Sequence, residues 1–133
     1  MSRVLADTFY FLALTNPRDQ AHARVVQWTL GFRGDMVTTA WVLTEFGNHM
    51  SSVRNRRVFV DTVRDLRSNA QVTILFPATA LFEDGLKLYE NRMDKEWSLT
   101  DCISFVAMQQ ESLMEALTGD RHFEQAGFVA LFK

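Results

Sequence analysis

Short apolar runs of β-type residues alternate along this chain with longer stretches whose apolar positions recur at helical spacing. Strands are predicted at residues 3–6, 36–39, 72–76, 114–118 and 129–132. Helices are predicted near residues 8–14, 19–31, 40–52, 55–69, 78–92, 99–111 and 121–126. This alternation is typical of a mostly parallel sheet between two layers of helices, so we expect a three-layer α/β/α sandwich.

The composition narrows the class of protein further. With 133 residues, 47% of them hydrophobic, the chain is expected to form a single domain over 1–133 rather than a disordered segment. The one cysteine, Cys102, excludes a disulfide framework and a cysteine-based zinc site, and it fits a reducing, cytoplasmic location. No apolar stretch is long enough to predict a membrane span. A net charge of −2 means that any nucleic-acid partner would need a local basic patch or bound metal cations.

Four carboxylates lie where predicted strands end or predicted helices begin, or on the core side of a helix. Asp7 follows the first strand, Asp120 follows the fourth, and Asp101 opens a helix that is apolar almost all round. Glu45 follows Trp41 by four residues and therefore shares the apolar side of its helix. Each has an ordinary alternative: helix capping for the three aspartates, and a buried ion pair with an arginine for Glu45.

The joint pattern of these acids is more specific than any one of them. The carboxyl ends of parallel strands meet at one edge of a sheet, where open α/β folds bind their ligands. Several carboxylates gathered there could not all stay ionised without a cation. Ligands that offer only oxygen suit Mg²⁺ or Mn²⁺, and these metals serve phosphodiester chemistry.

These acids stand within segments that resemble the PIN domain. The segments are LADT at 5–8, TEFGN at 44–48, WSLTDCISF at 97–105 and LTGDRHF at 117–123. Together they span essentially the whole chain. The size also resembles that of stand-alone PIN proteins, many of which are VapC-like toxins of toxin–antitoxin pairs. The resemblance implies a five-stranded sheet of order 3-2-1-4-5 and a metal-dependent ribonuclease.

The resemblance also assigns roles to particular residues. It implies that Asp7, Glu45, Asp101 and Asp120 form the acidic quartet that binds the metal and carries catalysis. It implies polar supporting positions beside the acids, which fall on Thr8, Asn48 and Thr118. The sequence departs from the family at Phe9, where many members have a small polar residue. That departure removes one supporting hydroxyl and leaves the four acids in place.

Basic residues offer a candidate RNA surface. Arginines crowd the predicted helix at 55–69 and the turn before it, and Arg121 directly follows Asp120. The candidate RNA contacts are Arg54, Arg56, Arg57 and Arg121. The alternative for the helical group is a solvated face with ion pairs within the helix. The three histidines, His22, His49 and His122, are interpreted as surface or partly buried residues rather than as metal ligands.

The leading hypothesis is a Mg²⁺- or Mn²⁺-dependent endoribonuclease, the toxin of a toxin–antitoxin pair. The main alternative is a catalytically silent RNA- or protein-binding PIN module, and a DNA-directed nuclease ranks last because the chain is short. An RNA substrate, a homodimer and an antitoxin protein are the expected partners. No Gly-rich phosphate loop and no Gly-x-Ser-x-Gly motif is present in the sequence, so a nucleotide-cofactor enzyme and a serine hydrolase of that type are not expected.

Overall fold

A computed structural model describes residues 2–133 and contains one five-stranded sheet. The strands are β1 (Arg3–Ala6), β2 (Asp35–Thr39), β3 (Val72–Leu75), β4 (Glu115–Leu117) and β5 (Val129–Ala130). Their order across the sheet is β3-β2-β1-β4-β5, and every neighbouring pair runs parallel. The predicted α/β class and strand order are therefore confirmed.

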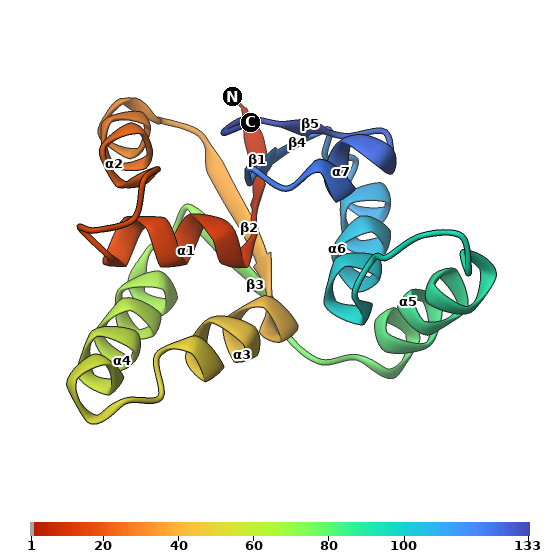
Figure 1. Ribbon diagram of the computed structural model, residues 1–133, viewed down its shortest axis with the longest axis horizontal. Helices are drawn as coiled ribbons and strands as arrows, with labels where there is room; N and C mark the ends of the chain where they lie inside the picture. The colour runs from red at the N-terminus through yellow and green to blue at the C-terminus, as the bar shows by residue number, and fades with distance from the viewer. Residues whose placement is uncertain (1) are drawn as a thin grey trace.

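Seven helices of the described chain cover the two faces of this sheet. On one side lie α1 (Thr8–Thr15), α2 (His22–Gly31), α3 (Ala40–His49) and α4 (Val53–Ser68) (Figure 1). On the other side lie α5 (Thr79–Asn91), α6 (Leu99–Gln110) and α7 (Arg121–Gln125) (Figure 1). The arrangement is the predicted three-layer sandwich.

The alternation of side chains along β1 explains why both faces are covered. Val4 and Ala6 pack into the core beneath α1 to α4, whereas Leu5 packs into the core beneath α6 and α7. All three are buried, because successive residues of a strand point to opposite faces and both faces here carry helices. The helix α6, which is apolar almost all round, is likewise buried along most of its length, as its sequence predicts.

Several element boundaries differ from the prediction by one to three residues, among them the end of α3 at His49 and the start of α4 at Val53, and two of the differences have a clear local reason. The helix predicted near 19–31 begins only at His22, because the Asp19 carboxylate accepts from the Ala21 N–H and holds a turn before it. The last strand ends at Ala130 rather than at Phe132. The Phe132 N–H still donates to the carbonyl of Thr118, so the chain continues beside β4 without regular strand geometry.

The register between β1 and β4 positions the candidate site. Ala6 pairs with Leu117, so the next residues on the two strands, Asp7 and Thr118, emerge side by side. Both lie at the edge of the sheet where the strands have their carboxyl ends. Among residues 2–133, no helix is long and apolar enough to cross a membrane.

Candidate metal centre

Asp7 is held by its neighbour across the sheet. The Thr118 hydroxyl donates to Asp7 Oδ2 over 2.9 Å, and both residues are buried. Asp7 occupies the N-cap position of α1, but its side chain makes no capping hydrogen bond there. Capping therefore does not explain the carboxylate, which turns instead toward Thr118.

Burial makes the charge of Asp7 costly. Loss of contact with water raises the pKa of this carboxyl from its ordinary value of 3.8 to about 7. The negative charges of Asp101 and Glu45 raise it as well, while the Thr118 hydroxyl and the Thr8 N–H lower it. A carboxyl with this pKa is only about half ionised at neutral pH, because the protein compensates its charge only in part.

Asp101 begins α6 in a capping box with Ser98. The Asp101 N–H donates to the Ser98 hydroxyl at 3.0 Å, and the Ser98 N–H donates to Asp101 Oδ2 at 3.2 Å. Burial nevertheless raises the pKa of the Asp101 carboxyl, and the nearby charge of Asp120 acts in the same direction. The capping alternative is thus correct for Asp101, and it fixes the carboxylate beside the other acids.

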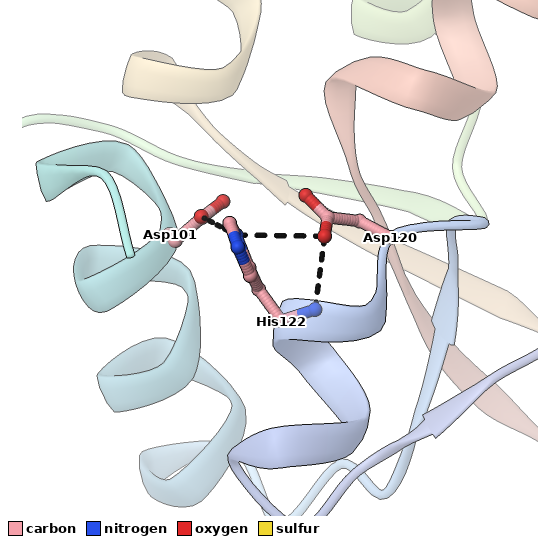
Figure 2. Close-up of side chains that lie close together, drawn as sticks. All are labelled: Asp101, Asp120 and His122. Atoms are coloured by element: carbon pink, nitrogen blue, oxygen red, sulfur yellow. Dashed lines mark hydrogen bonds and ion pairs between the residues drawn. The ribbon is translucent and has the colours of Figure 1, made fainter. Parts of the chain in front are cut away.

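Asp120 and His122 complete the group at the start of α7. The Asp120 N–H donates to Thr118 Oγ1 at 3.1 Å, and Asp120 Oδ1 accepts from the His122 N–H at 2.9 Å. The His122 ring lies between two carboxylates, with Nδ1 at 3.2 Å from Asp101 Oδ2 and 3.4 Å from Asp120 Oδ1 (Figure 2). Ligand atoms of Asp101, Asp120 and His122 lie within 4.8 Å of one another, which is close enough to share a metal ion.

Glu45 approaches the same group from the other layer of helices. It lies in α3, is half-buried, and its negative charge acts on Asp7. Within residues 2–133 it forms no ion pair, so the alternative of a buried pair with an arginine is not what the structure has. Charge interactions therefore connect Glu45 to Asp7, Asp7 to Asp101, and Asp101 to Asp120.

The donor set fits a hard divalent cation. Hydrogen bonds within the described chain occupy Oδ2 of Asp101 and Oδ1 of Asp120 and leave the other oxygen of each carboxylate without a donor. Figure 2 shows these two oxygens turned to the same side, away from the backbone of α7. Asp7 Oδ2 likewise takes the Thr118 hydroxyl, and Asp7 Oδ1 accepts no side-chain hydrogen bond from the described residues. Carboxylate oxygens presented singly in this way suit Mg²⁺ or Mn²⁺.

The other residues singled out from the sequence have different surroundings. The buried Thr8 hydroxyl has no hydrogen-bond partner within the described chain. Asn48 is exposed, and it lines a surface pocket between α3 and α4 together with Arg56. Phe9 stacks on Phe132 at 6.3 Å between ring centroids, so this apolar departure from the family pattern serves the core.

The four candidate arginines do not form one cluster with the acids. Arg54 lines a separate polar pocket of about 580 Å³ formed by the ends of α1 and α3 and the start of α4. Arg56 donates to the Ser51 carbonyl, and Arg57 lies 3.8 Å from Asp61 in an exposed ion pair. Arg121 is the first residue of α7 and is exposed directly beside Asp120.

His122 is the site residue that sequence reasoning missed. The sequence predicts a surface or partly buried histidine, and His122 is indeed half-buried, but it also contacts two of the four acids. A signal was present in the sequence, because His122 lies two positions after an aspartate that precedes a short helix. The first turn of a capped helix keeps that position close to the cap residue.

The fold is similar to that of solved structures over almost the whole length of the chain. The chain is similar to Mycobacterium tuberculosis VapC20, a toxin that cleaves the sarcin–ricin loop, with 22% identity over 98% of this chain and 99% of VapC20, and a TM-score of 0.88. It is also similar to FitAcB from Neisseria gonorrhoeae, with 20% identity over 98% of this chain and 96% of that chain, and a TM-score of 0.69.

A third structure, FitAB bound to the IR36 DNA fragment, matches with 20% identity over 96% of this chain and 92% of that chain, and a TM-score of 0.67. No protein-family model matches the sequence, and no curated protein sequence matches it. The similarity is therefore one of fold over the full length of the chain, at low sequence identity.

Proposed function

We propose that the protein is a Mg²⁺- or Mn²⁺-dependent endoribonuclease that acts as the toxin of a toxin–antitoxin pair. One observation carries the proposal: at one edge of the sheet, Asp101 and Asp120 each present an oxygen without a donor, next to a buried Asp7 whose charge is poorly compensated. The full-length similarity to VapC20, itself a toxin that cleaves an RNA loop, supports RNA as the substrate class.

Asp7, Asp101 and Asp120 would hold the cation, with Glu45 completing the set from α3. A divalent cation at this position supplies activation of a water molecule and neutralisation of phosphate charge during hydrolysis. Thr118 supports the site from below, since its hydroxyl donates to Asp7 and accepts from the Asp120 N–H. This single hydroxyl fixes two carboxylates relative to each other across β1 and the turn after β4.

RNA would reach the site along the positive side chains nearest to it. Arg121 follows Asp120 directly and is exposed, so it can contact a phosphate next to the scissile one. Arg54 and Arg56 line pockets on the surface of α3 and α4, and we propose them with Arg57 as contacts for more distant phosphates. The ion pair of Arg57 with Asp61 is exposed and therefore weak enough to exchange for a phosphate.

We also propose a homodimer and an antitoxin partner, in a cytoplasmic setting. Several large apolar side chains are exposed, among them Phe76, Met93 and Met114. The FitAB structure on a DNA fragment shows that a protein of this fold can act within a complex. Sedimentation of the isolated chain at micromolar concentration measures its mass directly, and only 15.3 kDa particles would contradict the dimer.

A catalytically silent binding module is the second candidate, and one observation favours it. Asp101 and Asp120 both cap helices, so each has a local structural reason to be present that needs no metal. Asp7 and Glu45 have no such role, which is why they separate the two candidates. Metal-dependent RNA binding without cleavage would support the silent module.

The experiment is cleavage of a mixed RNA pool with Mn²⁺, with EDTA as the metal-free control. Glu45→Gln keeps the shape of the side chain and removes its charge, so it should abolish cleavage while RNA binding persists. Glu90→Gln, the same change at an exposed position of α5, is the matched control and should cleave normally. Cleavage that survives both EDTA and Glu45→Gln would show that another site or another protein is responsible.

A further inference from the structure

The roles proposed for the four acids do not explain why His122 contacts two of them. Its side chain is 20% exposed and lies between Asp101 of α6 and Asp120 of the turn before α7. Asp101 is 21 positions away in the sequence, and no hydrogen bond joins it directly to Asp120. Within residues 2–133, His122 is therefore the only residue that hydrogen-bonds to both carboxylates, through its ring Nδ1 to Asp101 Oδ2 and through its backbone N–H to Asp120 Oδ1.

The partners of the ring decide which role it can have. Nδ1 faces two carboxylate oxygens, Asp101 Oδ2 at 3.2 Å and Asp120 Oδ1 at 3.4 Å, and an ionised carboxylate only accepts hydrogen bonds. Nδ1 between two acceptors must carry the hydrogen, so Nδ1 has no lone pair for a metal, and Nε2 is the ring nitrogen left that could bind one. Each of these two oxygens also accepts a backbone N–H, from Ser98 and from His122 respectively.

We propose that His122 is a positioning residue: its Nδ1–H holds Asp101 Oδ2, and its backbone N–H and nearby ring hold Asp120 Oδ1, so that the opposite oxygens face the metal. This inference rests on the metal-dependent function proposed above and assigns His122 a place outside the ligand set. Supporting donors of this kind orient metal-binding carboxylates in other proteins. The ring also links α6 to α7, so the carboxylates of Asp101 and Asp120 are already oriented before the cation binds.

Two substitutions at position 122 separate a donor from a ligand. Asn places an N–H donor near the position of Nδ1, whereas Ala removes donor and ring together. His122→Ala should weaken Mn²⁺ binding about 10- to 100-fold, the usual loss for such a supporting partner. His122→Asn should recover most of that loss. His49→Ala, which removes an exposed imidazole at the end of α3, is the matched control and should bind Mn²⁺ as the wild type does.

Calorimetric titration with Mn²⁺ gives the affinities, and electron paramagnetic resonance of the Mn²⁺-loaded wild type tests the ligand set independently. We expect no nitrogen coupling from a directly bound imidazole. Such a coupling, lost in both substitutions together with affinity, would make His122 a ligand and overturn the proposal. Unchanged affinity in His122→Ala would overturn it too. If His122→Ala does not fold, His122→Asn and the wild-type spectrum still decide.

Failure of the proposed function gives a different result. A wild-type protein that binds no Mn²⁺ and cleaves no RNA would remove the metal site altogether. If the wild type binds Mn²⁺ and substitutions at position 122 leave its affinity unchanged, only the role of His122 is refuted.

Discussion

Replacement of Asp7 by Asn should stabilise the metal-free protein at neutral and alkaline pH. The substitution keeps an oxygen that can accept the Thr118 hydroxyl and removes a charge that burial makes costly. The pKa of this carboxyl rises from 3.8 to about 7 on folding. At about 1.4 kcal/mol for each pH unit, the ionised form costs the folded state about 4 kcal/mol.

The sign of the pH dependence follows from the direction of the shift. Below pH 3.8 the carboxyl is protonated in both states and costs nothing. Between 3.8 and about 7 the unfolded chain has released the proton and the folded chain still holds it, so wild-type stability falls as the pH rises. Relative to Asp7→Asn, the wild type should therefore lose about 2.5 kcal/mol between pH 5 and pH 8.

Urea denaturation in EDTA at several pH values between 5 and 8.5 measures this difference. Asp65→Asn, at an exposed position of α4, removes the same charge without burial and should show no comparable pH-dependent gain. Adding Mn²⁺ should raise the stability of the wild type by linkage and that of Asp7→Asn much less. If Asp7→Asn is no more stable than the wild type at pH 8 in EDTA, the cost assigned to the buried charge is wrong.

Three further substitutions test the packing that supports the site, each by the free energy of unfolding in urea. Ser98→Ala removes the cap acceptor of α6 and should cost about 1 kcal/mol, whereas an unchanged stability would deny the capping box a role. Gly85→Ala places a methyl group against Ile103 and should cost about 1–3 kcal/mol, because α5 and α6 must separate. Phe46→Ala empties a fully buried position next to Phe11 and should cost about 3–5 kcal/mol; a loss below 1 kcal/mol would contradict that packing.

The fold was predictable from the sequence because its signals are local and agree with one another. The strands are short and largely apolar, several helices such as α4 have a clear amphipathic period, and Ser98 marks the start of α6 by cap chemistry alone. The boundaries that differ are those set by side-chain turns or by irregular backbone, as at Asp19 and Phe132. Such features depend on single hydrogen bonds, which the spacing of apolar residues along the sequence does not predict.

The candidate site was predictable only as a set of residue types at one edge of the sheet. Sequence position places Asp7 and Asp120 after parallel strands, and parallel strands end at the same edge. Sequence position does not show which oxygen of each carboxylate accepts a hydrogen bond from the protein. This detail decides which oxygen is left to bind a cation. That information comes from the Thr118 hydroxyl and the Ser98 N–H, whose roles appear only when β1, β4 and α6 are placed together.

His122 shows the limit of local reasoning most clearly. Its proximity to Asp120 follows from a helix turn and was available in the sequence, but its contact with Asp101 joins two segments 21 residues apart. Taken alone, the first contact is an ordinary feature of a capped helix. Only with the second does the imidazole stand between two carboxylates whose mutual repulsion it relieves. The residue that organises the acids is thus one that no spacing rule for acids would select, because its function depends on a tertiary contact.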